Sequence, residues 1–363
     1  MRSLQILLVV SVGVILVSSV PLEQGKRLIK TSEEEPAKWM TDDEIWSLIE
    51  KHQNFIDITD HQDMPVAKPE DVDIKAIPTT LRYQTAVRTV LNSINADRIE
   101  AFVTQFSSYH NRYYTSATGL ESQKWLLAQV QESIRGYAGQ ASVREVTHTW
   151  AQSSIVARIE GADPTLASEV IILGGHQDSV NIWSSAMAAP GADDNASGSV
   201  VVLESLRAIV NSGFIPKRSI EFQWYAAEEV GLRGSAAIAQ EYSRQGVNVV
   251  GMFNFDVPGY QASGVTDIGI YTDNVNSALT QFLRILTTEY LEFGQRDRTC
   301  GYGCSDHVSF GNYNFPSAMA AEHTLHPQMH TAQDNLAGVS FTQVREFVKL
   351  AIGAIVEFGE PSN

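Results

Sequence analysis

The sequence predicts an α/β fold, a single domain with a mostly parallel, twisted central sheet and helices on both faces. The prediction rests on two patterns that alternate along the chain: short apolar runs of strand length, and segments whose apolar residues recur at helical spacing. Strands that alternate with helices form parallel sheets with both faces covered. The chain of 363 residues shows no internal repeat, low-complexity tract or interior linker, which favours one large domain.

The first half of this domain is expected to begin with helices and continue with strands. Apolar residues at helical spacing predict helices over residues 85–96, 98–109 and 123–137. Short apolar runs then predict strands over residues 143–150, 154–159 and 169–174.

The second half is expected to alternate between the two kinds of element. Apolar runs predict strands over residues 219–226, 249–255, 267–272 and 317–321. Helical spacing predicts helices over residues 196–212, 234–243, 278–290, 306–311 and 342–358. The parallel sheet follows from this alternation.

The N-terminus predicts a secretory leader over residues 1–19. Arg2 precedes an apolar run from Leu4 to Val17, and small residues follow through Ser19. The apolar run is too short to span a bilayer comfortably. We therefore expect a secreted, extracellular protein.

Residues 20–75 differ from the rest and are interpreted as a propeptide ahead of a catalytic domain over residues 76–363. The segment carries acidic clusters and few strand-like runs, and Thr41 is expected to cap a helix that continues through Ile49. The alternative is a structural N-terminal subdomain. The propeptide is expected to inhibit the enzyme, to assist its folding, or both.

Charge and cysteine content narrow the class of protein. A net charge of −16 argues against nucleic acid or an anionic membrane as the partner, because both need a basic surface. Cys300 and Cys304 are the two cysteines of the chain. In an oxidising compartment such a pair indicates a disulfide; the alternative is a pair of metal-bound thiolates.

Polar residues follow the apolar run Val170–Leu173, where a buried strand is expected to end in glycines. His176 and Asp178 are two apart, so on an extended strand end they share a face. Further on, Asp193, Asp194 and Asn195 lie between glycines, directly before the helix expected from residue 196. This grouping favours a cation site at the carboxyl edge of a sheet over a simple turn or helix cap.

Four further positions carry candidate side chains at or near strand ends. Glu228 and Glu229 follow one strand, Asp256 closes the next, and the segment Cys-Gly-Tyr-Gly-Cys-Ser-Asp-His spans residues 300–307. His330 lies in a late loop, and the alternatives for that position are His323 and His326. Histidines with several carboxylates suit a pair of zinc ions, or cobalt or manganese in the same places. Paired metals also need a carboxylate that bridges them.

Five motifs in this order resemble the secreted di-zinc aminopeptidases of peptidase family M28, the fungal and bacterial leucine aminopeptidases. The motifs are Gly-Gly-His-x-Asp-Ser, Pro-Gly-Ala-Asp-Asp-Asn-Ala-Ser-Gly, Ala-Ala-Glu-Glu-Val-Gly-Leu-Arg-Gly-Ser, Asn-Phe-Asp and His-Thr-Ala-Gln-Asp. The similarity covers residues 81–358. It implies an enzyme that releases apolar, leucine-like residues from peptides with a free N-terminus, by attack of a water held between two zinc ions.

The resemblance also implies a role for each site residue. His176 and Asp256 are similar to the ligands of one zinc ion, Glu229 and His330 to those of the other, and Asp194 to the bridging carboxylate. These five residues are the expected metal ligands.

Three further roles come from the same resemblance. Glu228 is similar to the general base that takes a proton from the attacking water. Asp178 is similar to the carboxylate that orients a histidine ligand. Tyr302, in the short loop of the expected Cys300–Cys304 disulfide, is similar to the hydroxyl donor that stabilises the oxyanion. The family further implies a cis peptide bond after Asp194.

A pocket for the first side chain of the substrate is expected near these residues. Met319, Met329 and Phe315 are candidates for its wall by position, although each is equally well explained as ordinary core. Asn195 begins an Asn-x-Ser sequence, and it is expected to be unmodified because a glycan there would block the site. The chain is expected to act as a monomer.

Three other functions remain as alternatives. A metallo-carboxypeptidase or deacylase would need a basic group for a substrate carboxylate, and within the motifs only Arg233 offers one. A glutaminyl cyclase would bind a single zinc ion. A binding protein with a peptidase-like fold would lack ligands, whereas here every expected ligand position is filled.

Overall fold

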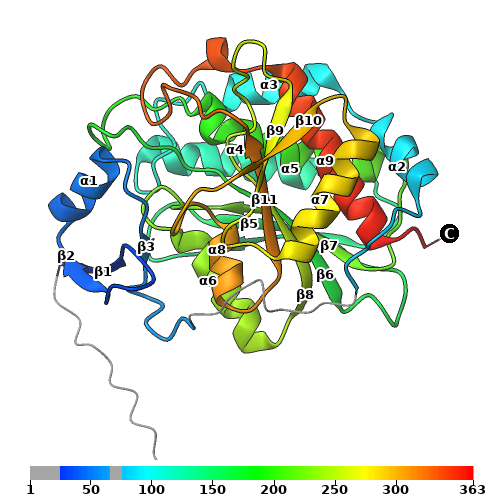
Figure 1. The fold of residues 1–363 in the computed structure, drawn as a ribbon, viewed down its shortest axis with the longest axis horizontal. Coiled ribbons are helices and arrows are strands. Elements are labelled where there is room, and N and C mark those ends of the chain that lie inside the picture. Colours follow the sequence, from blue (N-terminus) through cyan, green and yellow to red (C-terminus); the bar gives the residue numbers. More distant parts are fainter. Residues whose placement is uncertain (1–24, 66–75, 363) are drawn as a thin grey trace, which may run out of the picture.

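The computed structural model describes residues 25–65 and 76–362. An eight-stranded sheet runs through the body in the order β10-β9-β11-β8-β6-β7-β5-β4 (Figure 1). The four central strands, β11, β8, β6 and β7, are parallel to one another, whereas β9 meets β11 and β5 meets β7 in antiparallel fashion. The predicted α/β fold with a mostly parallel sheet is therefore confirmed.

The elements of the body alternate as the sequence predicts. The strands are β4 Ala141–Val146, β5 Ser154–Ile159, β6 Glu169–His176, β7 Ser219–Tyr225, β8 Asn248–Phe255, β9 Asp267–Tyr271, β10 Gly294–Arg298 and β11 Ser317–Glu322. The helices are α2 Gln84–Leu91, α3 Ala96–Phe106, α4 Ala117–Ser133, α5 Gly198–Ser212, α6 Arg233–Gln245, α7 Ser277–Tyr290, α8 His307–Asn312 and α9 Phe341–Gly359.

Helices cover both faces of the sheet because its central strands are apolar on both sides. In β6, Ile171 and Leu173 join the large core beneath α5, α7 and α9, whereas Val170 and Ile172 join a smaller cluster with residues of α6 and α8. Alternate side chains of a strand point to opposite faces of the sheet, so a continuous apolar run places apolar side chains in the core on each face.

Two of the departures from the sequence prediction have a clear physical reason. The expected helix over residues 98–109 ends at Phe106, and the chain is irregular until α4 begins at Ala117. In that stretch the backbone N–H of Arg112 donates to the hydroxyl of Ser179, a tertiary bond invisible to local periodicity. Strand β10 was not expected, because it is a polar, largely exposed edge strand without apolar alternation.

The described part of residues 20–75 forms a small folded module. Strands β1 (Arg27–Lys30), β2 (Lys38–Met40) and β3 (Ile56–Asp57) pair in an antiparallel sheet, with α1 (Asp42–Glu50) beside it, in blue in Figure 1. Thr41 caps α1 in a capping box with Glu44, as expected. The three strands were not expected. The predicted leader, residues 1–19, lies outside the described residues.

This N-terminal module, residues 25–65, docks on the body through apolar and charged contacts. Ile45 and Phe55 of the module pack in one buried cluster with Val180 and Ile182 of the body. The buried Asp57 carboxylate lies 3.1 Å from Arg27 and 3.3 Å from Arg233, so it joins a module cation to a body cation. Apolar burial supplies the attraction and the ion pairs set the orientation.

Within the described residues, no helix combines the length and the apolar character needed to cross a membrane.

We predict that Asp57→Ala loosens the N-terminal module. The substitution removes the buried carboxylate that joins Arg27 to Arg233 and leaves each arginine only an exposed acidic partner, and breaking a buried pair costs about 3 kcal/mol. Hydrogen exchange at the β1 amides of Leu28 and Ile29 measures the free energy of local opening. The matched control is Glu35→Ala, since the exposed Glu35–Lys38 pair contributes roughly 0–1 kcal/mol. Equal exchange in both variants would contradict the prediction.

Candidate metal centre

Three neighbouring parallel strands deliver acidic and histidine side chains to one edge of the sheet. His176 is the last residue of β6, Asp256 directly follows β8, and Glu228 and Glu229 follow β7 after a short turn. Strands β7, β6 and β8 are adjacent and parallel, so their carboxyl ends meet. Crevices outside such strand ends are where open α/β sheets bind ligands.

Asp194 reaches this edge from the irregular turn that precedes α5. The peptide bond between Asp194 and Asn195 is cis, as the resemblance implies. The buried carboxylate of Asp334 accepts hydrogen bonds from the backbone N–H groups of Asp193 and Asp194, both at 2.9 Å. The turn is thereby held from outside by a side chain of the late loop.

The five expected ligands come together in two groups that share Asp194. The Nε2 atom of His176 lies 3.0 Å from Oδ1 of Asp194 and 3.1 Å from Oδ1 of Asp256. The Nε2 atom of His330 lies 2.8 Å from Oδ2 of Asp194 and 3.0 Å from Oε2 of Glu229. One carboxylate therefore offers an oxygen to each group, which is the arrangement that a bridging ligand needs.

Asp178 contacts a residue or backbone segment of each ligand group. Its Oδ1 lies 3.6 Å from Nδ1 of His176, on the side of the ring opposite to Asp194. Its two oxygens also accept from the backbone N–H groups of Glu228 and Glu229, at 3.1 and 3.3 Å. The carboxylate thus links the end of β6 to the turn after β7.

The electrostatics of the cluster favour a bound cation. Burial raises the pKa of Glu228 well above its usual value, and burial together with the charge of Asp194 raises that of Glu229 to about 7. Although burial opposes it, neighbouring carboxylates raise the pKa values of His176 and His330. Imidazole nitrogens and carboxylate oxygens placed this closely fit zinc, and a divalent cation would offset the excess of buried negative charge.

A cavity of about 270 Å³ opens over the cluster. Glu228 lines it beside the metal-ligand candidates, and so do Met319 and Met329. Phe315 is not among the residues that line it: its ring packs with Phe310, at 6.2 Å between centroids, in the cluster under α6. The expectation that Phe315 forms a wall of the pocket is therefore wrong.

Tyr302 also lies outside this cavity. Its side chain packs against a buried cluster formed by Ile56 of the N-terminal module and by Leu232 and Val308 of the body. Burial raises the pKa of the Tyr302 hydroxyl, so the group stays protonated at neutral pH. The side chain can therefore donate a hydrogen bond, but in this arrangement it does not face the cluster.

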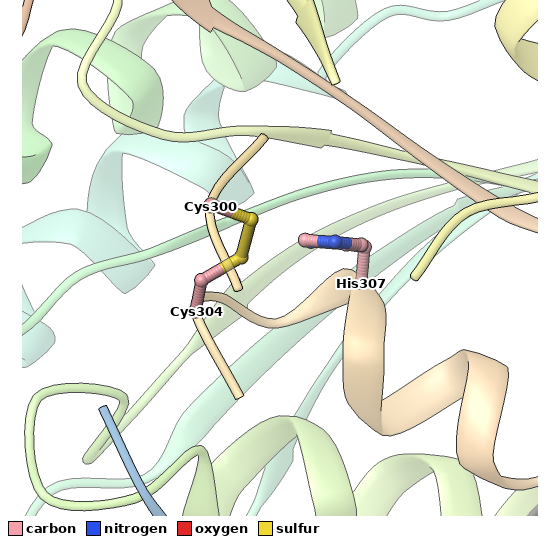
Figure 2. A group of neighbouring side chains, drawn as sticks. All are labelled: Cys300, Cys304 and His307. Atoms are coloured by element: carbon pink, nitrogen blue, oxygen red, sulfur yellow. A yellow bond between two sulfur atoms is a disulfide. The ribbon is translucent and has the colours of Figure 1, made fainter. Parts of the chain in front are cut away.

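The expected disulfide joins Cys300 to Cys304, beside the ring of His307 (Figure 2). The two sulfur atoms and a ring nitrogen of His307 lie within 4.8 Å of one another, but both sulfur atoms are used in the disulfide bond. Since thiolates are the species that bind zinc, the alternative of a thiolate metal site does not apply to this state. The disulfide shapes the cavity wall, to which Cys300 and Cys304 contribute.

Sequence reasoning missed the buried Arg112. Its guanidinium donates to the carbonyl oxygens of Gln177 at 2.8 Å and Gly191 at 2.9 Å, and so ties together the two turns that carry His176 and Asp194. A lone arginine between two expected helices carries no local signal of this role.

Several residues beside the ligands also have contacts that bear on the sequence predictions. Ser305 donates to Asp256 at 2.6 Å, and Asp334, although it stands in a recognised motif, had no expected role. Asn195 is fully buried and donates to the carbonyl oxygen of Phe255 at 3.0 Å, which leaves no room for a glycan. His330 joins the ligand groups found among the described residues, and neither His323 nor His326 does.

Comparison with known proteins relates the chain to one peptidase family and to fungal aminopeptidases of similar length. The model of peptidase family M28 matches residues 154–355. The chain is 39% identical to leucine aminopeptidase 1 of Arthroderma gypseum, over 95% of this chain and 96% of that protein. It is 38% identical to leucine aminopeptidase 1 of Aspergillus niger, over 88% and 85% of the two chains.

A solved structure is similar over the same extent. The LapA aminopeptidase of Legionella pneumophila has a TM-score of 0.80 and 27% sequence identity, and 95% of each chain is covered. The motifs at the strand ends, the matched family model and the full-length relatives agree, and the chain belongs to peptidase family M28.

Proposed function

We propose that the protein is a secreted zinc aminopeptidase that removes N-terminal, preferentially leucine-like residues from peptides. The observation that carries this proposal is the pair of ligand groups that share Asp194 inside a cavity that Glu228 also lines. The full-length relatives named leucine aminopeptidase support it. Neither a single-zinc cyclase nor a non-catalytic binding protein is favoured by a specific feature, because both ligand groups are complete.

The two groups would hold two zinc ions. His176 and Asp256 would bind one, Glu229 and His330 the other, and Asp194 would bridge them. Zinc bound there would supply Lewis acidity, which lowers the pKa of an attacking water and polarises the carbonyl group of the scissile bond.

Glu228 is placed to move the proton in this reaction. Its carboxylate lines the cavity, and its backbone N–H is fixed by Asp178. Burial raises its pKa, so the carboxylate is a stronger base than an exposed glutamate. We infer that it accepts a proton from the water that attacks the carbonyl carbon and delivers this proton to the departing amine.

The cavity walls explain why only a chain end would react. Val257, Met319 and Leu325 give the far side an apolar surface that suits the first side chain of the substrate. The free α-amine carries the charge that the buried carboxylates can accommodate. A residue in the interior of a peptide has no such amine, so we infer that the carboxylates select the chain end.

The N-terminal module is placed to inhibit the enzyme. His52 and Phe55 line the same cavity, and the ring of His52 stacks on that of His330 with 5.8 Å between centroids. The module also packs against Tyr302. We infer that its removal opens the cavity and frees Tyr302 to turn inward, where its hydroxyl can stabilise the oxyanion.

Secretion remains part of the proposal. The apolar run behind Arg2 supports a leader over residues 1–19, and the Cys300–Cys304 disulfide suits an oxidising compartment. We propose that the propeptide is residues 20–75, that processing occurs close to residue 76 and that the mature enzyme acts as a monomer.

We predict that Glu228→Gln lowers kcat for leucyl 4-nitroanilide by roughly 10²- to 10⁴-fold, because the amide cannot accept the proton. Zinc content, measured by mass spectrometry after dialysis, is expected to stay unchanged. The control is Glu132→Gln on the exposed side of α4, which should alter neither value. A Glu228→Gln enzyme with full activity would rule out the base role.

We predict that loss of a ligand belonging to one group and loss of the shared ligand have different effects on metal content. Asp256→Asn removes a ligand from one group and is expected to leave about one zinc ion bound, whereas Asp194→Asn weakens both sites together because that carboxylate is shared. Zinc titration by isothermal calorimetry on the metal-free chains separates the two results. An Asp194→Asn protein that still binds two ions tightly would refute the bridging role.

We predict that Asp57→Ala raises the activity of the full-length chain toward leucyl 4-nitroanilide, because it loosens the module without touching the cavity. The comparison is with the same chain after the module is removed by limited proteolysis, which gives the upper limit. Glu35→Ala serves as the control and should leave activity unchanged. Equal activity of the full-length and trimmed chains would show that the module does not inhibit.

A further inference from the structure

Arg298 gives the cavity a charged group on its otherwise apolar side. It lines the cavity next to Tyr271 and Thr299, on the same wall as Val257 and Met319. The sequence motifs of the site do not include it, and it is not among the expected ligands or catalytic groups.

The position of Arg298 in the sheet places it at the cavity. Arg298 ends β10, where it pairs with Tyr271 of the parallel neighbour β9 (Figure 1). Two residues earlier in β9, Gly269 leaves space for the arginine stem: a Cβ atom there would lie 3.0 Å from Cγ of Arg298. Ala321 of β11 pairs with Gly269. Two small residues thus form the floor over which the arginine extends.

The guanidinium has no anionic partner within the part of the chain that the structure describes. No carboxylate of those residues lies within ion-pair distance of it; the side chain interacts with the hydroxyl of Tyr271, and its Nε atom is buried without a hydrogen-bond partner. Asp273, in the turn after β9, is engaged elsewhere, since it accepts from the backbone N–H groups of Cys300 and Gly301. A buried donor without a partner is costly unless a ligand supplies the acceptor.

We propose that Arg298 is a specificity-determining residue that selects substrates whose first side chain ends in a hydrogen-bond acceptor, glutamate above all and glutamine next, over substrates that begin with lysine or arginine. The inference rests on the proposed aminopeptidase function and names the substrate class of that same cavity. Leucine remains a substrate, because its side chain needs only the apolar wall.

The chemistry of the wall accounts for this selection. The methylene groups of a glutamate side chain pack against Val257 and Met319, as leucine would, and the terminal carboxylate then meets the guanidinium. A hydrogen bond to a charged group contributes about 1.5–3 kcal/mol, equivalent to roughly 10- to 100-fold in kcat/KM. A lysine ammonium in the same place faces a like charge, which disfavours it.

The test measures kcat/KM for leucyl, glutamyl, glutaminyl and lysyl 4-nitroanilides on the trimmed enzyme. The native residue is compared with Arg298→Met, which keeps the stem and removes the charge, and with Arg298→Lys. Arg296→Met is the matched control, since Arg296 lies in the same strand but is exposed and paired with Asp267 at 2.7 Å. Ratios between substrates do not depend on the fraction of folded enzyme.

We expect the glutamyl-to-leucyl ratio to fall at least 10-fold in Arg298→Met, and the lysyl-to-leucyl ratio to rise, with partial recovery of both in Arg298→Lys. Arg296→Met should change neither ratio. Unchanged ratios in Arg298→Met, or a native enzyme that prefers lysyl over glutamyl substrate, would overturn the inference while leucyl hydrolysis still supports the proposed function. No hydrolysis of any anilide would refute the proposed function itself.

Discussion

The Asp194 carboxylate, shared between two histidines, is the contact on which the rest of the site depends. Its oxygens lie 3.0 Å from Nε2 of His176 and 2.8 Å from Nε2 of His330, residues that are 154 positions apart in the chain. A single carboxylate that serves two partners tolerates little displacement of either one. The turn before α5, the end of β6 and the late loop must therefore be fixed relative to one another.

The surrounding structure meets this requirement largely with backbone groups. Asp178 and Asp334 each accept two backbone N–H groups from the segments that carry the ligands, and Arg112 donates to carbonyl oxygens of two of these segments. Buried charges are tolerated where such hydrogen bonds are made. Burial lowers the pKa of Arg112 to about 10, while nearby carboxylates oppose the change, so the arginine stays charged.

Local patterns in the sequence indicated the fold and the polar strand ends, whereas the full ligand set, His330 above all, came from the resemblance to the family. His176 and Asp256 end apolar runs, and strand ends of a parallel sheet converge, so their proximity could be predicted. Arg112, Arg298 and the orientation of Tyr302 could not, because each depends on which distant segment packs against it. The module strands β1 and β3 were missed for a related reason: they are short and are stabilised by docking more than by their own periodicity.

The covalent connection between the N-terminal module and the body has a consequence for how tightly the module needs to bind. While the chain is intact, docking is intramolecular, and a covalently tethered module acts at an effective concentration on the order of millimolar. For the proposed inhibition, modest affinity would then be enough to keep the module over the cavity. Under the proposed processing close to residue 76, the same contacts would act between separate molecules at far lower concentration, and dilution alone would make release irreversible in practice. Secretion into a large volume would therefore complete activation without a dedicated step to expel the module.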